Sequence, residues 1–231
     1  MNIMFGRAPR HKAEVSALSN GIAEAVQNAD IIGMPDLDRL KYIEHRIRVE
    51  GERGVYQDTR GISGSMNAVL YPAILLNAAP PMRSPTITSC YCHSDLLPFY
   101  DDLLKNVDNI GLISCYPSLP ERLKSRWSLG HIDFFQIPDQ ASNSRAVGSS
   151  FENLTKAGHY PERFRELMKS LRVTRAGQIF LISAGILGKI YCNRLKQLGA
   201  IAIDIGSVAD VWMGQPVRIY HDVDFLSRWR L

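Results

Sequence analysis

Two glycines, a lysine and an aspartate near the carboxyl end of the sequence have the spacing of a phosphate-binding turn. Gly185 and Gly188 follow a continuous apolar run, Lys189 comes next, and Asp204 ends a second apolar run about 20 residues after Gly185. Glycines permit a tight turn and a close approach of the backbone to a ligand, and the first N–H groups of a helix attract anions. In dinucleotide-binding folds an acid at the end of the next strand takes the ribose hydroxyls. The pattern indicates a nucleotide site.

The turn departs from the two common phosphate-binding fingerprints. Ser183 stands where G-x-G-x-x-G has its first glycine, and no Gly-Lys pair is followed by Ser or Thr. Two other interpretations therefore stay open. The glycines could serve only helix-to-sheet packing while Asp204 caps a turn, or the Asp-Ile-Gly-Ser phrase at 204–207 could belong to an S-adenosylmethionine or NAD site. In each nucleotide interpretation Gly206 and Ser207 join the candidate binding residues.

Apolar runs of strand length alternate with segments of helical period, and this alternation predicts the elements that hold the turn. The predicted strands are 29–34, 86–88, 109–115, 131–137, 179–184 and 200–205. The predicted helices are 11–28, 36–49, 62–78, 94–105, 119–127, 161–173 and 186–198. Strands separated by helices favour a parallel sheet that is covered on both faces. We therefore expect the α/β class, as a Rossmann-like, mostly parallel sheet of about six strands with helices on both faces.

Composition is that of an ordinary globular protein. The 231 residues suit a single domain over 1–231, and 45% hydrophobic with 22% charged residues allow a packed core. The net charge is +4 and the cations are spread along the chain, which argues against a nucleic-acid partner but leaves a weak attraction to an anionic membrane surface open. Four cysteines and no apolar run of membrane-spanning length predict a cytoplasmic protein without a membrane span. The oligomeric state is not indicated.

Residues after the predicted strands are further candidates, because ligands bind outside the carboxyl ends of parallel strands. Ser89 is a candidate binding residue at the end of the strand over 86–88. His93, which can titrate near neutral pH, and Asp210, a carboxylate, are the candidate catalytic residues. The alternative for His93 is a turn residue that caps the next helix. Weaker candidates for contacts with phosphate or acceptor are Arg60, Gln140, Asn143 and Arg145, the last three in a long polar loop.

The segment AGILGKIYCNRLKQLGAIAIDIGSVADVWMG, 184–214, resembles the C-terminal segment of the GT-D-type glycosyltransferases of bacterial surface-glycan and capsule gene clusters. The pieces ITSCYCHSDLL at 87–97, NIGLISCY at 109–116 and FFQIPDQ at 134–140 are similar in spacing. The resemblance implies a Rossmann-like sheet and transfer of a sugar from a nucleotide diphosphate, commonly a UDP-sugar, to a glycan or glycolipid acceptor. It also implies a divalent metal, Mn²⁺ or Mg²⁺.

The metal motif of that family, a short Asp-x-Glu near the N-terminus, has no counterpart in this sequence. In the family this motif lies within a longer Arg-x-Gly-Asp-Gly-Glu-like segment, and Phe-Gly-Arg at 5–7 is only a poor match to that segment. Either the chain begins downstream of the motif, or this branch has lost metal-dependent catalysis and acts as a binding subunit of a glycan assembly complex. Other acidic pairs stand at 36 and 38, 50 and 52, and 222 and 224. The pair at 36 and 38 directly follows a predicted strand, and a helix cap explains it equally well. The other two pairs are more simply solvated segments, so the metal ligands are not assigned.

Overall fold

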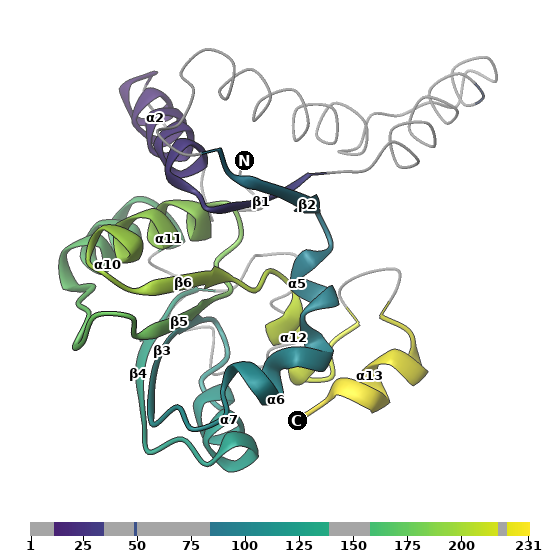
Figure 1. Cartoon of the computed structure of the whole chain (residues 1–231). Helices are drawn as coiled ribbons and strands as arrows, with labels where there is room; N and C mark the ends of the chain where they lie inside the picture. Colours follow the sequence, from purple (N-terminus) through teal and green to yellow (C-terminus); the bar gives the residue numbers. More distant parts are fainter. Residues whose placement is uncertain (1–11, 35–48, 50–83, 139–157, 217–220) are drawn as a thin grey trace. The chain divides into compact units, whose positions relative to one another are not determined.

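A computed structural model describes residues 12–34, 49, 84–138, 158–216 and 221–231 of the chain (Figure 1). Contacts divide the chain into two compact units, one of residues 23–92 and one of residues 1–22 with 93–231, and each is described by itself. Several expectations lie outside the described residues: the helices over 36–49 (Val49 excepted) and 62–78, the loop over 139–157, and Arg60, Gln140, Asn143 and Arg145.

The smaller unit contains a parallel pair of strands. β1 (Ile31–Met34) pairs with β2 (Thr86–Ser89), with Ile32 opposite Ile87. A Cβ atom at Gly33 would lie 2.9 Å from the carbonyl oxygen of Ser89, so the close approach of the two strand ends requires glycine at that position. The preceding helix α2 (Lys12–Asn28) begins in the larger unit, where a Cβ atom at Gly21 would lie 3.1 Å from the Ile190 side chain.

The larger unit is built on a four-stranded parallel sheet of order β4-β3-β5-β6. Its strands are β3 (Asn109–Ser114), β4 (His131–Gln136), β5 (Ile179–Ile182) and β6 (Ile201–Asp204). The two central strands are continuous apolar runs because both of their faces are covered, and Leu112 and Leu181 are fully buried. A Cβ atom at Gly111 would overlap the Phe180 ring, so a small residue in β3 makes room for the aromatic side chain of β5.

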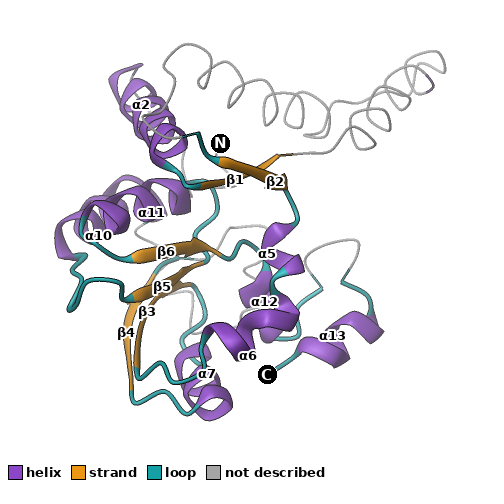
Figure 2. Cartoon of the chain, viewed as in Figure 1, coloured by secondary structure: helices purple, strands orange, loops and turns teal. Residues whose placement is uncertain are grey.

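Helices cover both faces of this sheet (Figure 2). α7 (Leu119–Trp127) connects β3 to β4, and α11 (Leu187–Gln197) connects β5 to β6 in the opposite direction across the sheet. Because such crossovers are right-handed, α7 and α11 lie on opposite faces, and α10 (Phe164–Ser170) packs beside α11. The direction of winding reverses between β3 and β5. The carboxyl ends of these two strands therefore form the topological switch point, where ligands bind in open α/β sheets.

The prediction of one continuous helix over 94–105 is wrong. The chain instead forms three short turns, α5 (Cys92–Asp95), a 3₁₀ turn (Leu97–Phe99) and α6 (Tyr100–Leu103). Pro98 explains the break, since its ring nitrogen cannot donate the hydrogen bond that a continuous helix needs. Tyr100 still packs edge-on against Trp212 of α12 (Val208–Trp212), with ring centroids 4.9 Å apart. The turns therefore bury the apolar side chains that suggested a helix.

Two further helical elements lie at 159–163 and 223–229, before α10 and after α12. A single π-helical turn (His159–Arg163) leads into α10, where the sequence predicts a helix from Pro161, and α13 (Val223–Trp229) forms where the sequence predicts no element. Asp222 caps α13, because its Oδ1 accepts the Phe225 N–H at 2.8 Å. The acidic pair at 222 and 224 is thus explained by a helix cap.

The α/β class and the parallel strands are confirmed. The predicted strands are found within two residues of their expected ends, but the described residues arrange them as sheets of four and two strands in place of one sheet of about six. Strand pairing is set by contacts between distant segments, which a local apolar pattern does not record. The expectation of a single domain stays a prediction. Within the described residues, none of the helices combines the length and the apolar character that crossing a membrane requires.

Candidate functional site

The turn between β5 and α11 joins a left-handed glycine to the first turn of a helix. Gly185 adopts a φ of +56°, a conformation that residues with a Cβ rarely take. α11 begins two residues later, and its first turn closes through Gly188, whose N–H contacts the Gly185 carbonyl oxygen at 3.1 Å. The N–H groups of residues 185–187 make no hydrogen bond within the described part of the chain. They lie at the amino end of a helix of 11 residues, where the helix dipole favours negative charge.

Gly188 serves packing rather than ligand contact. It is buried, and a Cβ atom there would lie 3.3 Å from Ile182, the last residue of β5, and 3.6 Å from Ala184, two residues after the strand. Close helix-to-strand packing is the role of the third glycine in the dinucleotide fingerprint. The structure therefore agrees with the packing interpretation for Gly188. Gly185 is the glycine that the turn conformation requires.

Lys189 and Asp204 form an ion pair at the carboxyl ends of β5 and β6. The Lys189 Nζ lies 2.5 Å from Asp204 Oδ2 and donates a hydrogen bond to the Gly185 carbonyl oxygen at 3.3 Å. Asp204 Oδ1 accepts the Gly206 N–H at 3.0 Å. The side chains are 47% and 25% exposed, so both are accessible to a ligand at this edge. The sequence places these residues at one site, and the structure brings them into direct contact.

The turn after β6 is joined to the turn after β5. Gly206 has a φ of +49°, and its carbonyl oxygen accepts a hydrogen bond from the Ser183 hydroxyl at 2.8 Å. The His93 ring packs on Gly206, since a Cβ atom there would lie 3.1 Å from it. Ser207 is only 3% exposed, and its hydroxyl has no partner among the described residues. Its side chain therefore faces the interior and not the ligand edge, by which we mean the solvent-facing side at the carboxyl ends of β5 and β6. His93 thus joins the site, while Ser207 is a poor candidate for ligand contact in this conformation.

A second polar contact crosses the same edge. The Tyr116 hydroxyl donates a hydrogen bond of 2.7 Å to Asp210 Oδ1, which ties the segment after β3 to α12 after β6. Tyr116 is 2% exposed, whereas Asp210 is half-buried. The carboxylate is therefore held from the interior and remains partly accessible, as a general base needs to be.

Ser89 belongs to the smaller unit, and its surroundings are described within that unit alone. Its hydroxyl accepts the Tyr91 N–H at 3.1 Å, which closes the turn that follows β2. This local hydrogen bond is sufficient to explain a serine at the position.

Three titratable side chains lie on α11 or contact it: His159 and Tyr191 are buried, and Cys192 is half-buried. Burial raises the pKa of the Cys192 thiol far above its ordinary value, and the nearby Asp204 carboxylate raises it further, so Cys192 is not a thiolate nucleophile. His159 pairs with the Tyr191 hydroxyl at 2.9 Å, and burial, reinforced by the Arg163 charge, lowers the pKa of His159 to about 4. Burial likewise raises the pKa of Tyr191. All three groups are uncharged at neutral pH.

The described residues do not fit the divalent metal that the family resemblance implies. They include no cluster of three His, Cys, Asp or Glu side chains that could hold a metal ion. At the ligand edge the Asp204 carboxylate is paired with an ammonium group and the Asp210 carboxylate with a phenol. The acidic pairs at 36 and 38 and at 50 and 52 lie outside the described residues.

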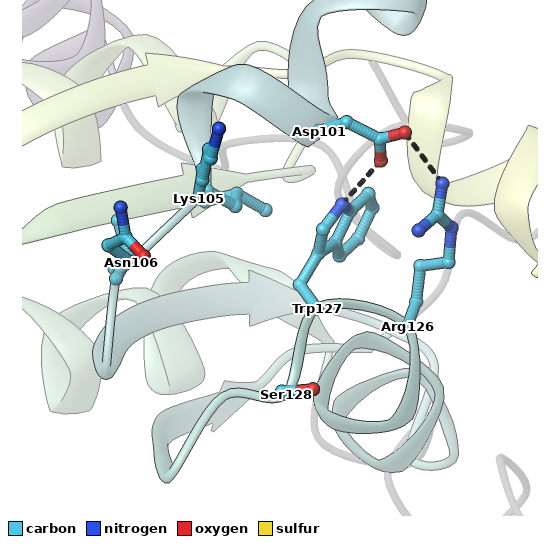
Figure 3. Close-up of a pocket in the computed structure, with 8 residues that line it drawn as sticks. Asp101, Lys105, Asn106, Arg126, Trp127 and Ser128 are labelled. Carbon is cyan, nitrogen blue, oxygen red and sulfur yellow. Dashed lines mark hydrogen bonds and ion pairs between the residues drawn. The ribbon is translucent and has the colours of Figure 1, made fainter.

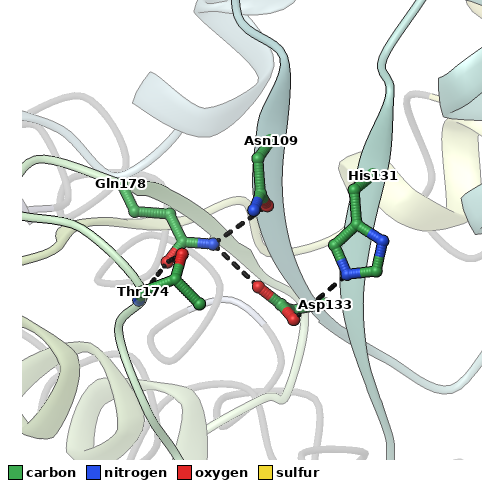
Figure 4. A network of polar contacts seen from close by, with 5 residues as sticks. All are labelled: Asn109, His131, Asp133, Thr174 and Gln178. Atoms are coloured by element: carbon green, nitrogen blue, oxygen red, sulfur yellow. Dashed lines mark hydrogen bonds and ion pairs between the residues drawn. The ribbon is translucent and has the colours of Figure 1, made fainter.

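Two other polar groupings lie at the amino ends of the same strands. Figure 3 shows a pocket of about 550 Å³ between the ends of α6 and α7, where Asp101 accepts hydrogen bonds from Trp127 Nε1 at 2.8 Å and from Arg126 at 2.7 Å. The hydrogen bond from the Trp127 indole lowers the pKa of Asp101. Figure 4 shows the buried amide of Gln178 in a network with Asn109, Asp133 and Thr174, beside His131.

Sequence reasoning missed the contribution of Ser183 and the pairing of Tyr116 with Asp210. Ser183 stands at the position of the missing first glycine, where its hydroxyl bridges the two strand-end turns. Tyr116 lies two residues after β3, so the rule that ligands bind at strand ends covers it, although nothing local identifies Asp210 as its partner.

Comparisons of the chain with protein-family models, with curated proteins and with solved structures gave no match. The resemblance to GT-D-type glycosyltransferases therefore stays a prediction, and the function is argued from the geometry of the edge.

Proposed function

We propose that the protein is a cytoplasmic glycosyltransferase that takes a sugar from a nucleotide diphosphate, a UDP-sugar by resemblance, and transfers it to a glycan or glycolipid acceptor in bacterial surface-glycan synthesis. The observation that carries the proposal is the β5–α11–β6 unit. In this unit a glycine turn with a φ of +56° opens a helix, and Asp204 ends the neighbouring strand. A Rossmann-like fold of the whole chain is part of the same proposal.

The residues of the edge have distinct parts in the proposed site. The N–H groups of residues 185–187 and the Lys189 ammonium face the diphosphate, while Asp204 takes ribose hydroxyls with the lone pairs that its present partners leave. Transfer needs a group that stabilises the charge developing on the departing diphosphate and a base that removes the acceptor proton. Asp210, held by Tyr116 at 2.7 Å, is the base, and His93, against Gly206, is the second candidate.

Ligand binding tests the nucleotide site. Isothermal titration of the full chain with UDP, UDP-sugars, NAD and S-adenosylmethionine, each with Mn²⁺ and with EDTA, should give a signal with UDP and UDP-sugars alone. Binding of NAD or S-adenosylmethionine in place of UDP would show that the same turn serves another class of nucleotide enzyme.

Turnover tests the chemistry separately. The rate of UDP release from UDP-sugars is measured for the full chain and for the D210N variant. D210N should lower this rate by about a hundredfold or more, the size usual for loss of a general base. Tight binding of a UDP-sugar without any turnover, in the presence of candidate acceptors, would favour a non-catalytic binding subunit.

A further inference from the structure

We infer that Lys189, held by Asp204, supplies the positive charge for the donor diphosphate in place of a divalent metal ion, an inference that rests on the proposed function. Glycosyltransferases that use a metal hold it with carboxylates beside the diphosphate. In this chain the carboxylate beside the phosphate turn is already neutralised by an ammonium group, which lies 2.5 Å from Asp204 Oδ2.

The contacts of Asp204 argue against a cation ligand at this point. One oxygen faces Lys189, and the other accepts the Gly206 N–H at 3.0 Å. A divalent cation bound to the same carboxylate would sit beside the ammonium group and be repelled by it. The described residues place no group of three His, Cys, Asp or Glu side chains together that would hold such a cation.

The contacts of Lys189 place its charge where a diphosphate would bind. The ammonium also reaches the Gly185 carbonyl oxygen at 3.3 Å, so it lies beside the turn whose N–H groups, at residues 185–187, make no hydrogen bond among the described residues. The side chain is 47% exposed, which allows a phosphate oxygen to reach it without unfolding of the turn. A compact ammonium of this kind binds phosphate as a point charge. On binding, the lysine exchanges part of its contact with Asp204 for the diphosphate.

The inference can be tested by titration with inorganic pyrophosphate and UDP, in EDTA and in Mn²⁺. For the wild-type chain we expect the Kd of each ligand to be the same within about threefold in both conditions. K189Q should raise both Kd values in EDTA by about tenfold or more, because a charge-assisted hydrogen bond is lost, and Mn²⁺ should not restore binding.

Two further variants separate a ligand contact from a structural pair. D204N removes the anion that competes for the ammonium, so pyrophosphate should bind more tightly, by roughly threefold to tenfold. K196Q removes the same charge from the carboxyl end of α11 and should leave both Kd values unchanged. Urea unfolding of each variant checks that the fold is kept.

Several results would overturn the inference: a wild-type Kd for UDP that falls tenfold or more with Mn²⁺, unchanged binding by K189Q, or weaker pyrophosphate binding by D204N. Metal-dependent UDP binding that ignores K189Q would reject the lysine while the proposed function stands. Lysine-dependent binding of pyrophosphate with no preference for UDP would support the lysine and reject the nucleotide site. Absence of binding by either ligand would reject both.

Discussion

The four-stranded sheet has polar side chains at the amino ends of its strands, here called the amino edge, and at their carboxyl ends, the carboxyl edge. The two edges use these side chains in opposite ways. At the amino edge, both amide atoms of Gln178 are satisfied, with Nε2 2.9 Å from Asp133 Oδ2 and Oε1 accepting the Thr174 N–H at 2.9 Å, and the side chain is fully buried. At the carboxyl edge, Lys189 and Asp204 are partly exposed, and the left-handed glycines of the two turns, Gly185 and Gly206, are half-buried. Saturated buried networks fix a fold, whereas accessible groups with unused capacity bind ligands. The comparison explains the amino edge by stability and agrees with the ligand site that we propose at the carboxyl edge.

The largest expected effect is on stability, at the amino edge. Q178L should lower the free energy of unfolding by about 4 kcal/mol, because Asn109, Thr174 and the Asp133 carboxylate all lose a buried partner. D204N at the opposite edge should change it by less than about 1 kcal/mol, since its ion pair is partly exposed. Urea unfolding at pH 7 measures both. Equal losses for the two variants would contradict the division of roles between the edges.

The next effect is a pH dependence on the α11 side of the carboxyl edge. His159 has a pKa of about 4 in the folded protein and 6.5 in the unfolded chain, so between these values the unfolded chain binds the extra proton. Stability from this group is complete above pH 6.5, falls by roughly 3 kcal/mol as the pH drops to about 4, and is constant below.

H159Q provides the control for this pH dependence. The amide keeps a hydrogen-bonding group near the Tyr191 hydroxyl and does not titrate, so its unfolding curves should lose the slope between pH 6.5 and 4 that His159 produces. If wild-type and H159Q stabilities run parallel across this range, His159 is not the group responsible.

A matched pair of glycines sharpens the comparison of the edges. Gly185 at the carboxyl edge has a φ of +56°, and Gly177 at the amino edge has a φ of +77° with open space around its Cβ position. G185A and G177A should each cost about 1 to 2 kcal/mol, the price of a left-handed alanine. Only G185A should weaken pyrophosphate binding in calorimetry. A similar loss of binding in G177A would point to general destabilisation.

Much of the fold could be predicted because apolar runs and helical period are local. The helix over 119–127 and all the strands appear where the sequence predicts them, and Gly199 ends α11 with a φ of +92°. The division of the strands between two sheets could not be predicted, since it depends on pairing between distant segments. The helical break at Pro98 was readable from the residue type, but the apolar period around it favours a continuous helix.

The sequence predicts the location of the candidate site but not the contacts between its residues. Strand ends nominate Gly185, Lys189 and Asp204 together, and the structure brings them into contact. The pairing of Tyr116 with Asp210 joins residues 94 positions apart, and no local pattern encodes it. The interior position of Ser207 could not be predicted either, because a serine after a strand end is as often a cap as a ligand.

The smallest expected effect on stability tests whether the carboxyl edge positions a base. Y116F removes one hydrogen bond to a partly exposed carboxylate that water can solvate instead, so unfolding should change by about 1 kcal/mol or less. If Asp210 is the base, the freed carboxylate loses its orientation, and kcat for sugar transfer should fall about tenfold with the KM for the donor unchanged. A purely structural tyrosine would lower stability and leave kcat of the folded fraction intact. If Tyr116 positions Asp210, Y116F should lower kcat and D210N should lower it further. The double variant Y116F/D210N should then have the same kcat as D210N alone, because Tyr116 acts only through Asp210.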